Sequence, residues 1–190
     1  VPRYTDAQLD QVIRGGARPD RELWDMPSHL FTQLTDEDMA AVIAFLRTRA
    51  PTGDVRPEPE FVASTRREIE SGHYPSARAQ VRRDGARWPP DAGPGHALGR
   101  YIVRSTCAEC HGLDLRGGQP NPGAKPRPDL RIAAAYDGDQ FKRLMRTGVP
   151  AGQNELTLMK QVALRRYKHL TDAEIGAVHA YLKQVAETAP

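Results

Sequence analysis

Three residues within five positions offer the clearest chemistry in this 190-residue sequence. Cys107 and Cys110 stand three positions apart, and His111 follows directly. On a helical turn, positions i, i+3 and i+4 lie on one face, so two thiols and an imidazole would point toward the same object. The chain contains only these two cysteines. We therefore predict one shared site for the three side chains.

Two thiols and an imidazole at this spacing are the signature of covalent haem attachment, in which the thiols add to two vinyl groups and the imidazole binds the iron. Other uses fit less well. A thioredoxin-like redox pair is expected in a βαβ context, which the pattern lacks. A zinc site needs further Cys or His at ligand spacing, and a disulfide between cysteines three apart is unusual. We predict one haem c on Cys107 and Cys110, with His111 as an axial ligand.

The chain repeats one helical pattern on either side of a proline-rich middle. Each copy starts at a tyrosine, Tyr4 or Tyr136, and continues into an amphipathic helix that stops at glycine. A Leu-Thr-Asp segment, at 34–36 and at 170–172, then precedes a last amphipathic helix. Because no alternating apolar run indicates a strand, we expect an almost wholly α-helical fold.

The repeat sorts the four methionines, one of which could be the second axial ligand, since Met/His pairing is an established form of haem ligation. Met145 and Met39 occupy positions where the other copy has isoleucine, which predicts that both are core residues. Met26 and Met159 lie 22 and 23 residues after the matching tyrosines, between the glycine stop and the last helix. Met159 is the predicted ligand of the haem on His111, and a packing methionine is the alternative.

Histidine is the rival type of axial ligand. His179 is expected to face outward or to pack as an ordinary helix residue. His169 precedes the last helix and could reach a haem edge, but a surface position is the simpler expectation. Bis-histidine ligation remains as the alternative. Five histidines lie outside the attachment segment: His29, His73, His96, His169 and His179.

A metal-bound histidine normally donates its other ring N–H to a carbonyl or carboxylate, which fixes the ring. The backbone carbonyl of Pro128 is the predicted partner of His111, and Leu130 is expected to pack on the haem ring. A stiff loop would hold this carbonyl in place, whereas a plain solvent loop is the alternative. That loop contains Gly117, Gly118, Pro120, Pro122, Gly123 and Pro126.

The middle of the chain, residues 51–94, contains seven prolines, which disfavour long regular elements. We expect a linker there, with one short helix around residues 61–70. The predicted organisation is a helical half-unit at 1–50, a Pro/Gly-rich linker at 51–94 and a haem-bearing domain at 95–190. No stretch approaches the ~20 apolar residues of a membrane-spanning helix, and any signal or anchor is expected outside these residues.

The net charge of +3 is unevenly distributed. Residues 1–50 are negative by two, whereas residues 99–190 hold 14 Lys/Arg and nine Asp/Glu. This surplus is too sparse for nucleic-acid binding, which needs a dense basic stripe. It suits steering toward an acidic protein partner, although a solvated mixed surface explains it equally well. Arg165 or Arg166 is alternatively a partner of a haem propionate. The basic residues that could frame a docking face are Lys125, Arg127, Arg131, Lys142, Arg143, Arg146, Arg165, Arg166 and Lys168.

In chain order, Gly99, the 107–112 segment, the 128–130 segment, Met159 and the 177–182 segment resemble a class I cytochrome c domain. The resemblance covers about residues 95–187. It implies a helical domain in which Gly99 is the small residue where the first helix crosses the last. It also implies a one-electron carrier rather than an enzyme.

The tandem arrangement is similar to the soluble parts of bacterial dihaem cytochromes c, such as electron-accepting subunits of membrane-bound dehydrogenases. In that family each domain carries its own CxxCH, His and Met. Residues 1–50 match only the second half of such a domain, with Met26 where the axial methionine would be. Either the chain starts in mid-protein, which the start at Val1 without methionine favours, or a half-domain has degenerated. In the first case Met26 would ligate a second haem.

The resemblance implies a respiratory-chain relay between a dehydrogenase or quinol-oxidising complex and an oxidase, reaction centre or soluble cytochrome. Two other classes stay open, a haem enzyme of the peroxidase kind and a haem-based ligand sensor. Both need an open sixth position on the iron, which Met159 would fill. Because covalent haem attachment takes place outside the bacterial cytoplasm, the resemblance also implies the periplasm or its membrane face.

Overall fold

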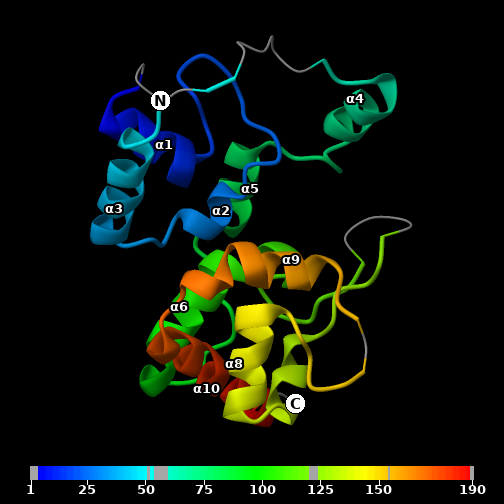
Figure 1. Cartoon of the computed structure of the whole chain (residues 1–190). Coiled ribbons are helices and arrows are strands. Elements are labelled where there is room, and N and C mark those ends of the chain that lie inside the picture. The colour runs from blue at the N-terminus through cyan, green and yellow to red at the C-terminus, as the bar shows by residue number, and fades with distance from the viewer. Residues whose placement is uncertain (1–3, 51, 54–59, 120–123, 154, 189–190) are drawn as a thin grey trace. The chain divides into compact units, whose positions relative to one another are not determined.

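The computed structural model describes residues 4–50, 52–53, 60–119, 124–153 and 155–188. Within these ranges the chain is helical, and its extended pairing is limited to isolated bridges, Ala17 with Glu22 and Gly118 with Arg127. The prediction of an almost wholly α-helical fold is confirmed. The chain divides into two compact units, residues 1–87 (unit 1) and residues 88–190 (unit 2), whose elements Figure 1 labels. Among the described helices, none is both long and apolar enough to cross a membrane.

Unit 1 has a small core between its first and third helices. Leu9 and Ile13 contribute one side, and Met39 and Ile43 contribute the other. Met39 is 3% exposed, so its prediction as a core residue is confirmed. The helices of this unit are α1 (Asp6–Gly15), α2 (Ser28–Phe31), α3 (Asp36–Arg47), α4 (Ala63–Glu70) and α5 (Ala77–Asp84).

The segment expected as a linker belongs in large part to unit 1. The short helix predicted around residues 61–70 is present as α4, but α5 was not expected, and it packs against α2. Ala77 is fully buried and donates its backbone N–H to the carbonyl of Leu23 at 2.8 Å. The compact unit therefore extends to residue 87, and residues 51 and 54–59 of the expected linker lie outside the described part of the chain.

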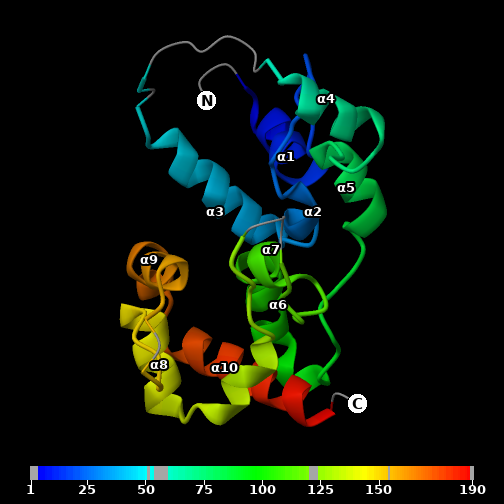
Figure 2. The ribbon, with the colours of Figure 1, turned by 90° about the vertical axis from the view of Figure 1, so that its right-hand side faces the viewer.

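Unit 2 forms a larger core in which α6 and α10 cross (Figures 1 and 2). A Cβ added at Gly99 would lie 2.2 Å from the carbonyl oxygen of Ala177 and 2.6 Å from the Cβ of Tyr181. Only glycine allows this approach, as the resemblance implied. The elements are η1 (Pro94–His96), α6 (Ala97–Thr106), α7 (Ala108–His111), η2 (Leu130–Ala135), α8 (Gly138–Thr147), α9 (Leu158–Arg165), η3 (Tyr167–His169) and α10 (Asp172–Thr188).

The sequence repeat is also a structural repeat. Helices α1 and α8 both begin with a capping box, formed by Thr5 with Gln8 and by Asp137 with Gln140. Both end at a left-handed glycine, Gly16 in one unit and Gly148 in the other. In each unit an arginine near that end reaches the first residue of the next long helix of the repeat, α3 or α10: Arg14 pairs with Asp36, and Arg146 pairs with Asp172. The two units therefore share one local construction, although no equivalent of α6 precedes α1 in the described residues.

Candidate haem site

The attachment turn lies where α6 ends and α7 begins. Backbone N–H groups of Cys110 and His111 both donate to the carbonyl of Cys107, at 3.1 and 3.0 Å, which keeps the three residues on one helical turn. Both cysteines are free thiols, Cys107 buried and Cys110 exposed. Burial raises the pKa of the Cys107 thiol, with hydrogen bonds from its neighbours opposing the shift in part. The turn thus presents two unoxidised thiols beside one imidazole.

The imidazole of His111 is held by the carbonyl that the sequence predicted. Its Nδ1 lies 2.9 Å from the backbone oxygen of Pro128. A carbonyl only accepts, so Nδ1 carries the proton and Nε2 keeps the lone pair that can bind a metal. Burial lowers the pKa of His111, with the Pro128 bond acting in the opposite direction. The neutral ring that a metal ligand must be is therefore the favoured form.

The loop after α7 reaches Pro128 because of one glycine. Gly117 has φ +71°, and a Cβ there would lie 2.2 Å from the carbonyl oxygen of Arg127 and 2.5 Å from that of Pro128. Its N–H donates to the carbonyl of His111 at 2.9 Å, and Gly118 exchanges two backbone bonds with Arg127, at 2.7 and 3.0 Å. These bonds hold the returning segment of the loop, residues 127–128, beside the imidazole. Pro120, Pro122 and Gly123, which were expected to stiffen this loop, lie outside the described residues.

Met159 is the second residue of α9, and in the sequence it lies far from the attachment turn. Its side chain is half-buried and packs against the core cluster of unit 2, as do Leu130 and Val162. Large apolar side chains nearby in the sequence remain uncovered, namely Ile132 (57% exposed), Val149 (44%), Leu158 (44%) and Leu164 (45%). Two thiols, a neutral imidazole and uncovered apolar side chains fit a covalently attached haem, a large apolar group with an iron centre. Whether Met159 and Leu130 touch that group stays a prediction.

Several other side chains singled out in the sequence have a structural role. Met145 is 3% exposed, so its core position is confirmed. His179 packs inside rather than facing outward: its ring stacks on Phe141 at 4.5 Å between centroids, and its Nε2 lies 3.2 Å from the carbonyl oxygen of Ala133. His169 lies in η3 and is exposed. His169 and His179 thus have ordinary surroundings.

Four of the nine basic residues considered for docking make bonds within unit 2. Lys142 and Arg146 both pair with Asp172, at 2.7 and 2.8 Å. Arg131 forms an ion pair with Asp129 at 2.5 Å. Arg143 donates to the carbonyl of Pro150 at 3.3 Å. These four are thus held within unit 2, and which of the nine frame a docking face stays a prediction. Lys125, Arg165, Arg166 and Lys168 are exposed.

In unit 1, Met26 is half-buried and packs against the core of α1 and α3. Its loop is braced by an aromatic group in which Trp24 stacks on Tyr74, with 5.6 Å between ring centroids. The hydroxyl of Tyr74 donates to the carboxylate of Asp25. Burial, together with this carboxylate, raises the pKa of Tyr74 to about 12, so the phenol stays a donor. The methionine of unit 1 therefore has a defined place, equivalent along the repeat to that of Met159.

Two residues that shape the site are not evident from the sequence. Gly117 is one of several glycines in its loop, and only the structure shows that its positive φ places the Pro128 carbonyl. Tyr167 stands among charged residues with no periodic apolar pattern that would indicate its role. Its hydroxyl donates to the carbonyl of Thr106 at 2.9 Å.

Comparison with known proteins agrees with this geometry. Residues 96–186 match the family model of cytochrome c, so this part of the chain is a c-type cytochrome domain. The matched residues include the attachment turn, so they fit an electron-transfer domain that holds covalently bound haem c. The chain is 27% identical over 209 residues to the fructose dehydrogenase cytochrome subunit of Gluconobacter japonicus. That alignment covers 97% of this chain and 42% of the relative, so the chain spans less than half the relative's length.

Proposed function

We propose that unit 2 relays single electrons through one haem attached to Cys107 and Cys110, with His111 and Met159 as its axial ligands. The observation that carries this proposal is the bond between His111 Nδ1 and the Pro128 carbonyl, 2.9 Å long, on the same turn as two free thiols. It presets the imidazole for iron before any ligand is bound. Bound there, the haem supplies a one-electron Fe(III)/Fe(II) couple.

A methionine on the second side of the iron decides between a carrier and an enzyme. Met/His ligation raises the reduction potential and fills both axial positions. A peroxidase-like enzyme or a ligand sensor needs one of these positions open. Met159 stands in the first turn of α9, whose exposed apolar residues Leu158 and Leu164 suit contact with a haem. The proposal is therefore an electron carrier without catalysis at the iron.

The absorption spectrum of the oxidised protein tests the ligand pair. A weak near-infrared sulfur-to-iron band is expected in the 190-residue chain with one haem on Cys107 and Cys110, and Met159→Ala should remove it from this chain. Met145→Ala is the matched control, because that methionine is 3% exposed in the core of unit 2 and is not the predicted ligand, and it should keep the band. A high-spin spectrum of the natural chain without this band would overturn the carrier reading.

We further propose that the chain serves as the electron-accepting part of a dehydrogenase complex in the periplasm or at its membrane face. The relative named above is a cytochrome subunit of a fructose dehydrogenase, which supports a dehydrogenase donor without identifying its substrate. Covalent haem attachment outside the cytoplasm supports the compartment. Osmotic-shock fractionation of the native cells should release the haem-stained chain with periplasmic or membrane fractions, and recovery with the cytoplasmic fraction would contradict the proposal.

A second proposal concerns unit 1, as the back half of another haem domain with Met26 as its axial ligand. Helices α3 and α10 can be compared by counting residues from the threonines that cap them, Thr35 and Thr171. Val178 and Tyr181 of α10 are 1% and 0% exposed, and their side of the helix is crossed by α6 at Gly99. Counted in the same way, α3 presents Val42 and Phe45, which are 38% and 56% exposed. An α6-type helix carrying its own CxxCH is the occupant that this uncovered face fits.

The haem count of the intact protein, taken from its natural source and weighed by mass spectrometry, tests this second proposal. At least one haem beyond the one on Cys107 is expected, and Met26→Ala should then remove part of the near-infrared band that Met159→Ala leaves behind. One haem in total, with a band unaffected by Met26→Ala, would leave Met26 as a core residue and reject the proposal.

A further inference from the structure

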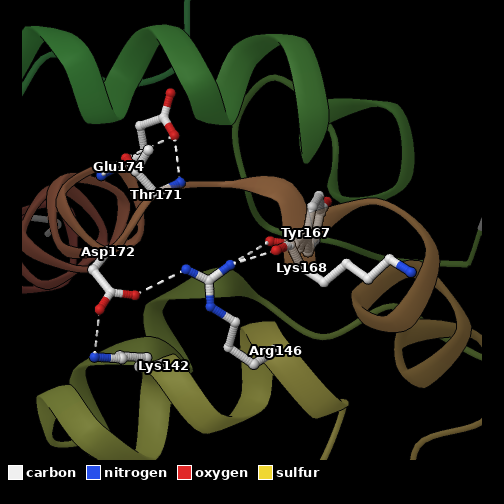
Figure 3. Close-up of polar contacts among 7 residues, drawn as sticks. All are labelled: Lys142, Arg146, Tyr167, Lys168, Thr171, Asp172 and Glu174. Atoms are coloured by element: carbon white, nitrogen blue, oxygen red, sulfur yellow. Dashed lines mark hydrogen bonds and ion pairs between the residues drawn. The ribbon is translucent and has the colours of Figure 1, made fainter.

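A short segment between the predicted ligand helix and the last helix is held from two sides. This segment is η3 (Tyr167–His169), which follows α9 directly. From α8, Arg146 donates to the backbone carbonyls of Lys168 at 2.7 Å and Tyr167 at 3.4 Å, and it also bonds to Asp172 at 2.8 Å (Figure 3). The backbone of η3 is therefore fixed to α8 and to the start of α10.

The side chain of Tyr167 fixes the same segment to the attachment turn. It is 5% exposed, and its hydroxyl donates to the carbonyl oxygen of Thr106 at 2.9 Å. The Sγ of Cys107 lies 3.9 Å from the same hydroxyl. Burial, with Cys107 as the next cause, raises the pKa of Tyr167 well above its usual value, so the phenol keeps its proton. One residue thus connects the end of α6 with the segment that follows α9.

We propose that Tyr167 is a positioning residue that keeps Met159 in place as the sulfur ligand of the haem iron. The proposal rests on the ligand pair proposed above. His111 and Met159 come from segments far apart in the sequence, and both must keep their spacing for two axial bonds to form. The Tyr167–Thr106 bond joins the α9 side to the α6–α7 side next to Cys107, where the porphyrin is attached. Without this bond, the α9 segment can move away from the attachment turn more easily.

The expected size of the effect follows from the energy of one hydrogen bond. Removing the hydroxyl takes away a bond of ordinary net strength and leaves the Thr106 carbonyl without this donor. If the bond is lost when Met159 leaves the iron, its removal raises the population of the methionine-off state about fivefold. An external ligand that takes the methionine's place should then bind more tightly by the same factor.

Imidazole binding to the oxidised holoprotein measures this population directly. Tyr167→Phe should bind imidazole about fivefold more tightly than the natural chain. Tyr181→Phe is the matched control: its residue is 0% exposed, and its hydroxyl donates to the carbonyl of Pro90 at 2.8 Å. The control also loses one buried tyrosine bond, but in a different part of the core, so its imidazole affinity should stay at the natural value. Equal affinities for the two variants would overturn the proposal.

A second pair of variants keeps the test decisive if Tyr167→Phe does not accumulate with haem. Arg146→Gln loosens the same segment from its other side and should also tighten imidazole binding. Arg14→Gln removes the equivalent arginine of unit 1, where the bonds go to Leu34, Thr35 and Asp36, and should not. Identical imidazole affinities for this pair would overturn the proposal.

The ligand pair and this inference fail in different ways. If the natural chain shows no sulfur-to-iron band, Met159 is not the ligand and both proposals fall. If the band is present and Met159→Ala removes it, while Tyr167→Phe binds imidazole as the natural chain does, only the role of Tyr167 is rejected.

Discussion

The orientation of His111 depends on a backbone geometry that a single glycine supplies. The Pro128 carbonyl accepts the Nδ1 proton because the 117–118 turn lies directly against residues 127 and 128. At Gly117 the positive φ and the close approach coincide, so a side chain would meet both a conformational and a steric obstacle. At Gly118, φ is also positive, at +108°, but a Cβ there would meet nothing within 4 Å. Comparing the two glycines therefore separates the steric effect of an added Cβ from the effect of a positive φ.

Gly117→Ala is expected to lower the free energy of unfolding more than Gly118→Ala does. The left-handed conformation of Gly117 alone costs about 1–2 kcal/mol for a residue with a Cβ, and Gly118→Ala also carries a cost for its positive φ. Only Gly117→Ala also places a Cβ against the Arg127 and Pro128 carbonyls, so it alone should speed exchange of the Nδ1 proton of His111. Urea unfolding and NMR of the reduced protein measure the two quantities. Equal destabilisation with equal proton exchange would show that the loop does not fix the imidazole through Gly117.

The sequence was informative about residues whose role depends on local spacing. The attachment turn, the Pro128 carbonyl and the core positions of Met39 and Met145 could all be read from motif or repeat. Contacts between distant residues could not. The Tyr167–Thr106 bond joins residues 61 positions apart, and no periodicity relates them. For His179 the sequence allows two positions, because both solvent-facing and core-facing histidines fit an amphipathic helix.

At the scale of elements, the same limit explains the missed helix α5. Its sequence is mostly polar, and only Ala77 and Asp84 are buried, so it lacks the apolar stripe by which a helix is recognised. Packing of α5 instead depends on single contacts: the buried Ala77 against the turn at Leu23, and Thr32 of unit 1 donating to the carbonyl of Gly85 at 2.5 Å. The proline count correctly indicated short elements in this region, and it did not indicate that they dock.

The start of α10 supports a prediction about pH. Hydrogen bonds from Lys142, and then from Arg146, lower the pKa of the Asp172 carboxyl (Figure 3). A lowered folded-state pKa means that the carboxylate stabilises the fold fully above its unfolded value of about 3.9, and that this contribution is lost as the pH falls through the folded value. Asp172→Asn should therefore melt at a lower temperature than the natural chain at about pH 6, with the difference vanishing near pH 2.

Asp139→Asn provides the control for that experiment, because Asp139 stands in the first turn of α8 as Asp172 does in the first turn of α10. It carries the same interaction with a helix N-terminus but lacks the Lys142 and Arg146 bonds. Its melting temperature should change less at about pH 6. A difference between Asp172→Asn and the natural chain that persists undiminished near pH 2 would contradict the ion-pair explanation.

The unequal burial of matching residues in α3 and α10 gives a second prediction at the scale of elements. Val178 is 1% exposed and Val42 is 38% exposed, at matching positions of α10 and α3. Val178→Ala should lower the unfolding free energy of unit 2 by about 1.5–2 kcal/mol, because about two buried methylene equivalents are removed. Val42→Ala should cost no more than about 0.5 kcal/mol in the chain as given. In the intact protein from its natural source, a cost of Val42→Ala that approaches the Val178 value would indicate that a helix covers α3, whereas an unchanged small cost would argue against one.

At the scale of the whole molecule, the electric field that a partner meets depends on the charges that are not paired within the molecule. Lys142 and Arg146 share the carboxylate of Asp172, and Arg131 pairs with Asp129. Two of these three positive charges are therefore offset within unit 2. Arg165, Arg166 and Lys168 are exposed, on or directly after the helix that carries Met159. Three exposed cations of residues 99–190 thus stand on, or directly after, the helix of the proposed ligand.

Reversing two of these charges should slow electron exchange with an acidic redox partner. Arg165→Glu with Arg166→Glu changes the field next to the Met159 helix, so the second-order rate constant should fall about tenfold at low ionic strength. The loss should disappear near 1 M salt, where the screening length is about 3 Å. Arg66→Glu with Arg67→Glu makes the same change in charge on α4 of unit 1, where both residues are exposed. Stopped-flow measurements of both variants against salt concentration locate the docking face: an effect confined to the α9 pair places it beside Met159, and equal slowing by both pairs would reduce the effect to net charge alone.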